Sequence, residues 1–336
     1  MLSTLITTAL MVVLYVALVR LVDMNEKEPL WAMLLFFAFG GIVAFAIAKL
    51  APAAISLNPL PKAAAEELGR FAAMGGGLVV LMWHGQRRGY QEFNGTLDGV
   101  VYGATVGLGF ATAQRLSGNL MGVSTGLPGM EPGMFDGFGV ALLEGLRCGV
   151  FGAILGAGLG GASEARSPAL RGILPFVGLV LAFAANAGHA WLGEGNAFSD
   201  SGMLRSRIAL GLPAVAIVAV VAYALRREGK TIRTQLAEET QTGAVAPDEL
   251  ALLSSALKRE ASYLGATLGF RWGELAAKKA LHNRQVQLAF TKEKLAGETD
   301  PERRAAAEGE VTTLRAAIAQ ARVAIRPASG AQGGAA

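Results

Sequence analysis

Two adjacent carboxylates, Glu66 and Glu67, and a nearby Arg70 are the residues of this sequence best suited to chemistry. They begin a long apolar run, and an ionisable group inside a bilayer usually faces the interior of a helix bundle for a functional reason. The four-residue spacing lets Glu66 pair with Arg70 on one helix face. That pairing leaves Glu67 free to act as a general base or as a ligand. The alternative is a position at the membrane surface, because Pro61 is close by.

Later polar residues could join the same chemistry. His189 lies late in an apolar run, where a lone histidine either orients water or a metal ion, or makes a structural hydrogen bond. Glu144 and Arg147 are three residues apart and form most simply an internal ion pair. Cys148 could be a soft metal ligand or a small buried hydrophobic residue. As the single cysteine, it excludes an internal disulfide and a Cys-based zinc cluster.

Composition indicates a membrane domain followed by a soluble one. Only 17% of the 336 residues are charged, against roughly 25% in an ordinary soluble protein, and the mean hydropathy is +0.42. The sequence is apolar up to about residue 225 and rich in charge after it. The net charge of +4 gives little reason to expect nucleic-acid binding.

Seven apolar runs predict membrane spans, since about 20 residues cross a hydrocarbon core. They cover residues 2–19, 30–50, 63–83, 97–116, 138–161, 171–192 and 207–225. An odd number of crossings places the two termini on opposite sides. Basic residues follow the last run, at positions 226, 227, 230 and 233, and predict a cytoplasmic C-terminus. In the fourth run, Gly103 and Gly107 form a small-xxx-small pair that lets a neighbouring helix approach closely.

The region after residue 228 has the pattern of soluble helices. Pro247, followed by two acidic residues, predicts a helix start. Gly297 predicts a helix stop, and Asp300 before a proline predicts an N-cap. Helices over 273–296 and 301–325 would form an antiparallel hairpin with facing apolar stripes. The stripes contain Leu275, Leu281, Leu288 and Leu295 on one helix and Leu314, Ile318 and Ile325 on the other.

These patterns predict an all-α protein: a polytopic membrane bundle of about seven transmembrane helices plus a C-terminal cytoplasmic helical domain. We expect the membrane domain over residues 1–226, the helical domain over 227–326, and a disordered Gly/Ala-rich tail over 327–336.

Several motifs, in order along the chain, resemble those of the PrsW-type intramembrane protease family, which is distantly related to the CAAX prenyl endopeptidases. The likeness covers about residues 20 to 195. The motif residues include Asp23, Glu28, Glu66, Glu67, Arg70, Asp98, Phe110 and His189, and the family's most recognisable signature matches residues 98 to 112. The resemblance implies an intramembrane site in which glutamates and histidines activate water, with or without a metal ion. Glu66, Glu67 and His189 would be its catalytic residues here.

The sequence departs from the family pattern at several site positions. Gln114 and Arg115 stand where the family has an acid followed by Asn, and Cys148 stands where it has its first histidine. Val140 replaces an arginine, and Gly193 replaces Asp or Asn. If a metal ion such as Zn²⁺ is bound, His189 and Cys148 are its expected ligands, with Glu67.

These departures favour a non-catalytic or impaired member of the family. It would bind membrane-protein clients in the bilayer, or a cytoplasmic signalling partner through its C-terminal helices, with the chain located in the plasma or bacterial inner membrane. The alternative is an active protease that hydrolyses membrane-protein substrates with a Glu- and His-activated water. A transporter is disfavoured, since the sequence has no obvious inverted repeat.

Overall fold

The computed structural model describes residues 2–23, 28–50, 58–88, 93, 95–120, 134–194, 200–268 and 271–325. The chain divides into two compact units, with the change from unit 1 to unit 2 between Val221 and Ala222. The predicted loop region 121–133 and the predicted tail lie outside the described residues.

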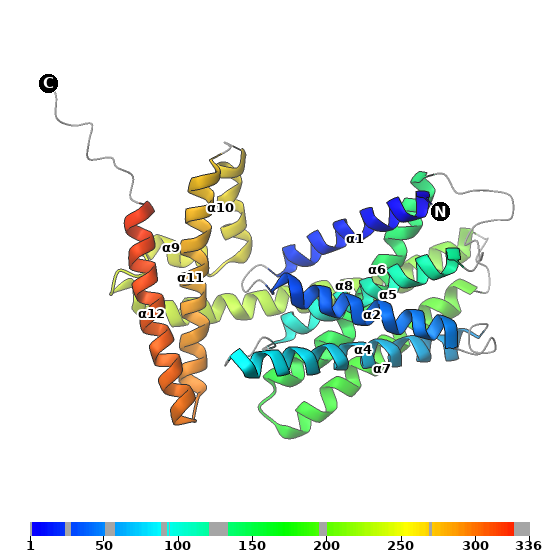
Figure 1. Cartoon of the computed structure of the whole chain (residues 1–336), viewed down its shortest axis with the longest axis horizontal. Helices are drawn as coiled ribbons and strands as arrows, with labels where there is room; N and C mark the ends of the chain where they lie inside the picture. Colours follow the sequence, from blue (N-terminus) through cyan, green and yellow to red (C-terminus); the bar gives the residue numbers. More distant parts are fainter. Residues whose placement is uncertain are drawn as a thin grey trace. The chain divides into compact units, whose positions relative to one another are not determined.

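Unit 1 is a bundle of α-helices, shown in Figure 1. Each of the seven predicted spans corresponds to one of them: α1 (Leu2–Val22), α2 (Leu30–Leu50), α4 (Pro59–Arg88), α5 (Thr96–Leu120), α6 (Met134–Glu164), α7 (Pro168–Glu194) and α8 (Asp200–Leu236). The described residues form no strand. The prediction of an all-α membrane bundle is therefore confirmed.

Five helices of the described chain are long and apolar enough to cross a membrane: α1, α2, α6, α7 and α8. The other two helices of unit 1, α4 and α5, are less apolar. Helix α4 carries Glu66, Glu67 and Arg70, which are all buried, and α5 packs against both α2 and α6. Polar or glycine-rich helices are expected where the neighbours are protein rather than lipid.

Glycines bring α5 close to α6. Gly99, Gly103 and Gly107 of α5 face Gly152 and Gly156 of α6, and a Cβ atom on any of them would overlap backbone atoms of the opposite helix. A second glycine contact joins α5 to α2, where a Cβ on Gly109 would overlap the backbone at Phe37. The small-xxx-small prediction for Gly103 and Gly107 is confirmed, and α5 is the helix held at the centre of these contacts.

Unit 2 is also helical. It contains the end of α8, a short 3₁₀ helix (Glu238–Thr240), α9 (Pro247–Leu253), α10 (Ala256–Leu268), α11 (Trp272–Gly297) and α12 (Pro301–Ile325). The predicted starts at Pro247 and Pro301 and the stop at Gly297 are confirmed. Asp300 caps α12, since its Oδ1 accepts the backbone N–H groups of Glu302 and Arg303 at 2.9 and 3.0 Å.

The predicted hairpin is formed by α11 and α12, which pack together. Its core contains Leu281, Leu288 and Ile318 from the predicted stripes, together with Ile232 and Leu236. The last two residues belong to α8, which continues as a helix well beyond the predicted end of the seventh span at residue 225. Leu275 lies apart from this core, against Tyr263 of α10.

Two buried polar groups complete the core of unit 2. Burial alone would raise the pKa of Glu239, but hydrogen bonds from Arg315 and Lys292 outweigh it and lower that pKa to about 2. Burial lowers the pKa of His282 to about 4. The His282 Nδ1 atom lies 2.9 Å from the Tyr263 hydroxyl. His282 is therefore neutral at pH 7, and its ring is packed inside unit 2 rather than exposed to solvent.

Candidate functional site

The glutamate pair lies inside unit 1, not at a surface. Glu66, Glu67 and Arg70 of α4 are at most 2% exposed. The Arg70 guanidinium hydrogen-bonds the carboxylate of Glu67 and lies 3.5 Å from Glu66 Oε2. The expectation that Arg70 would pair with Glu66 alone and leave Glu67 free is wrong, because the three- and four-residue spacings both place a carboxylate within reach of the long arginine side chain.

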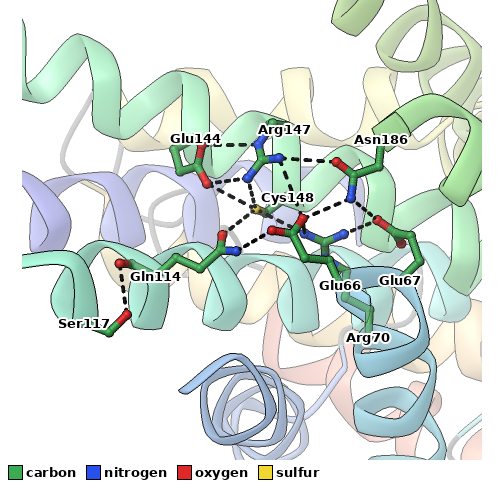
Figure 2. A network of polar contacts seen from close by, with 9 residues as sticks. All are labelled: Glu66, Glu67, Arg70, Gln114, Ser117, Glu144, Arg147, Cys148 and Asn186. Atoms are coloured by element: carbon green, nitrogen blue, oxygen red, sulfur yellow. Dashed lines mark hydrogen bonds and ion pairs between the residues drawn. The ribbon is translucent and has the colours of Figure 1, made fainter. Parts of the chain in front are cut away.

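A second arginine reaches the pair from α6. Arg147 donates to both oxygens of Glu144, at 2.6 and 3.2 Å, which confirms the predicted internal pair. The same guanidinium lies 3.8 Å from Glu66 Oε2 and donates to Asn186 Oδ1 at 3.3 Å. Arg147 thus joins the α6 carboxylate to the α4 pair, as Figure 2 shows.

Asn186 of α7 closes the arrangement. It is 1% exposed, and its Nδ2 donates to Glu66 Oε2 at 3.0 Å and to Glu67 Oε1 at 2.8 Å. Sequence reasoning gave this residue no role. Its only signal was an amide group inside an apolar run, and such a group must find a hydrogen-bond partner within the protein.

Two of the substituted family positions, Gln114 and Cys148, also reach the cluster. Gln114 Nε2 donates to Glu66 Oε1 at 2.8 Å. The Cys148 thiol lies 3.4 Å from Arg70 Nη2 and 3.7 Å from Gln114 Oε1, and is fully buried. Two of the five substituted positions therefore lie beside the glutamates.

Helix packing explains why these residues meet. The glycine contact between α5 and α6 includes Gly107 against the Cys148 backbone, so Gln114, two turns further along α5, lies beside Cys148. Phe110, one turn before Gln114, places its ring under Arg70, with the guanidinium carbon 4.7 Å from the ring centroid. This cation–π contact stabilises the buried guanidinium, because such contacts are stronger where water is excluded. The hydrogen bond from Ser117 Oγ to the Gln114 carbonyl oxygen continues the network along α5.

His189 and Gly193 are further along α7. The His189 ring packs edge-on against Phe151, with ring centroids 6.2 Å apart, and lines an apolar groove formed by α6, α7 and α8. Gly193 is in the last turn of α7, outside the residues whose surroundings the structure describes. The described hydrogen bonds from α7 to the glutamate pair come from Asn186.

Asp98 belongs to a different group of motif residues. It is in the first turn of α5, and sixteen residues separate it from Gln114, about 24 Å along a helix. Asp98 interacts with Glu28, which also accepts a hydrogen bond from Tyr102 and donates its backbone N–H to Asp23 Oδ2 at 2.6 Å. Apart from His189, the family-like motif residues therefore divide between two polar clusters, of which only one contains the glutamate pair.

The donor set around the glutamates does not fit a metal ion. Among the described residues, no group of three or more His, Cys, Asp or Glu side chains is placed to hold one. The expected ligand Cys148 has guanidinium nitrogens of Arg70 and Arg147 at 3.4 and 3.7 Å. Two fixed positive charges at that distance oppose a divalent cation, and they already supply the charge that such an ion would bring to the carboxylates.

Comparison with known proteins identifies a family for most of unit 1. Residues 28–225 match a family model described as PrsW family intramembrane metalloprotease. No curated protein and no solved structure matches the chain. The matched residues contain both polar clusters except Asp23, which precedes them.

Proposed function

Because the chain belongs to the PrsW family of intramembrane metalloproteases, we propose that it keeps the family's helix scaffold as a membrane-embedded binding module and does not hydrolyse peptide bonds. Its ligands would be membrane-protein clients, held within the bilayer. A cytoplasmic partner would bind through the helices of unit 2, on a C-terminal side that the basic residues after the last span assign to the cytoplasm.

One observation carries the proposal: both members of the glutamate pair are already engaged. Arg70 and Asn186 each contact both carboxylates, and Gln114 takes the second oxygen of Glu66. A general base must present a lone pair to the water that it deprotonates.

Hydrolysis also needs a group that holds water and stabilises the developing oxyanion. The family description names a metal ion for this chemistry. The other groups beside the glutamates here are the amides of Gln114 and Asn186 and a thiol in contact with guanidinium groups. A metal ion, where it binds, activates water and polarises a carbonyl oxygen. The residues of this chain instead neutralise the carboxylates and join α4, α5, α6 and α7.

The test is a cleavage assay with full-length protein in vesicles against a panel of single-span membrane proteins. We expect no cleavage above that of a Glu67→Gln variant, and we expect both proteins to be crosslinked to the same clients. Cleavage that is present in the wild type and lost in both Glu67→Gln and His189→Ala would overturn the proposal.

A second candidate is an active protease that uses Glu67 as its base. The observation in its favour is Glu67 Oε2, which is buried and has no hydrogen-bond partner among the described atoms. The cluster also has three carboxyl groups for two guanidinium groups, since Glu66, Glu67 and Glu144 face Arg70 and Arg147. A water molecule on Oε2 would then be the nucleophile. In the same assay this candidate predicts cleavage that Glu67→Gln abolishes and a metal chelator leaves unchanged.

A further inference from the structure

An apolar groove lies along unit 1, away from the glutamate pair. It has a volume of about 680 Å³ and is formed by α6, α7 and α8, which are all candidate membrane spans. Its lining is apolar apart from Thr96 and His189, and much of it is glycine and alanine, including Gly158, Gly178 and Gly188. Gly158 and Gly178 bring the backbones of α6 and α7 into contact, whereas Gly188 faces open space.

The length and the apolar lining of the groove suit a hydrocarbon chain. Its lining on α7 extends from Leu174 to Leu192, about 27 Å at the helical rise per residue. An extended hydrocarbon chain can lie along such a groove between membrane-spanning helices, with its apolar surface against the lining.

Basic residues lie at one end of the groove. Gly161 of α6 and Leu174 of α7 line it close to the turn that joins the two helices. Arg166 in this turn and Arg171 at the start of α7 are exposed, and Arg171 Nε donates to the Ala165 carbonyl oxygen at 2.8 Å. Basic residues at the end of an apolar seam between spans are the arrangement that recognises anionic lipid headgroups.

We propose that this groove binds one acyl chain of an anionic phospholipid, with the phosphate beside Arg166 and Arg171. The chain enters between α7 and α8 and covers the glycine positions, while the headgroup stays at the membrane surface. The site is independent of the glutamate pair, so the proposal does not depend on whether the protein hydrolyses peptide bonds.

Native mass spectrometry of the full-length protein tests this site with two lipids of identical acyl chains, phosphatidylglycerol and phosphatidylcholine. Two sets of variants separate the acyl chain from the headgroup. Gly188→Leu fills the groove, and its added Cβ meets no atom within 4 Å, so the backbone has no reason to move. Gly211→Leu is the matched control, because Gly211 is equally open, exposed and outside the groove lining. Arg166→Gln with Arg171→Gln removes the charge.

We expect the wild type and Gly211→Leu to bind phosphatidylglycerol about fivefold or more tightly than phosphatidylcholine, as two basic contacts imply. Gly188→Leu should lose binding of both lipids by a similar factor, and the double arginine variant should lose only the preference. Equal affinity of the wild type for the two lipids, or phosphatidylglycerol binding by Gly188→Leu that matches Gly211→Leu, overturns the proposal.

Discussion

Arg70 is the residue on which the polar cluster of unit 1 depends most. Its guanidinium is fully buried, contacts both glutamates and Cys148, and lies on the ring of Phe110. Taking an ion out of water costs several kcal/mol unless close partners compensate it. Each charge here is therefore held by the others, and removing one member leaves its partners buried without compensation.

Replacing Arg70 by Met tests this dependence. We expect a loss of about 3–5 kcal/mol in unfolding free energy, since two carboxylates lose a buried partner. Arg70→Lys should cost less, because it keeps the charge but loses the planar group that contacts several partners at once. Arg166→Met, at an exposed position, should change stability by no more than about 0.5 kcal/mol. Denaturant unfolding in detergent gives all three values, and similar values for Arg70→Met and Arg166→Met would contradict the role of Arg70.

His282 gives unit 2 a pH dependence. Its pKa is about 4 in the folded protein and about 6.5 when unfolded, so the unfolded chain binds more protons between these values. Stability is therefore complete above about pH 6.5 and falls as the pH decreases towards 4. We expect unit 2 to lose about 1–2 kcal/mol between pH 7.5 and pH 5.0.

The measurement is urea unfolding of the full chain followed by Trp272 fluorescence, with the other tryptophans replaced by Phe. His282→Gln removes the titrating group and should flatten this part of the pH profile. An equally steep profile in His282→Gln would assign the pH dependence to another residue.

At the scale of elements, the glycine contacts position the site. They let the α5 and α6 backbones touch, and this contact places Gln114 beside Cys148. Helix boundaries in unit 2 could be predicted from local signals, because a cap such as Asp300 acts within one turn. The partners of Asn186 and the contacts of Arg147 with other helices could not, since they depend on how four helices are rotated about their axes. No residue near either one in sequence fixes that rotation.

Gly156→Ala tests the contact between α5 and α6. The added Cβ would overlap the Gly99 carbonyl oxygen, so we expect the thermal midpoint in detergent to fall by several degrees as the helices are forced apart. Gly149→Ala is the matched control on the same helix. Its added Cβ would make only an ordinary contact, at 3.9 Å from the Ala104 carbonyl oxygen, and alanine favours the helix. A midpoint for Gly156→Ala equal to that of Gly149→Ala would mean that the packing adapts.

At the scale of the whole molecule, an apolar bundle and a polar helical unit follow from composition alone, because charge is concentrated after about residue 225. The family match covers residues 28–225, so α1 and most of unit 2 lie outside it. Composition could not reveal that α8 continues into unit 2 and contributes Ile232 and Leu236 to its core. Ile232 and Leu236 are buried only because the α11–α12 hairpin packs on them.

The seven crossings predicted from the sequence also predict the side of the membrane on which each loop and each end of the chain lies. In a Cys148→Ser background, Ser167→Cys and Thr299→Cys should react with a membrane-impermeant maleimide from the cytoplasmic face, and Asn58→Cys from the opposite face. All three positions are exposed. Labelling in sealed vesicles of known orientation provides the measurement. Reaction of Asn58→Cys and Ser167→Cys from the same face would show that the three helices between them, α4, α5 and α6, do not all cross the membrane.

We propose that arginine and amide side chains, in place of a metal ion, balance the glutamate pair. Elemental analysis of the purified full-length protein, after equilibration with zinc and removal of excess, tests it most directly. We predict zinc well below one ion per chain, with the same value in Cys148→Ser and His189→Ala. One zinc ion per chain that is lost in Cys148→Ser would contradict the claim and establish a metal site at the glutamates.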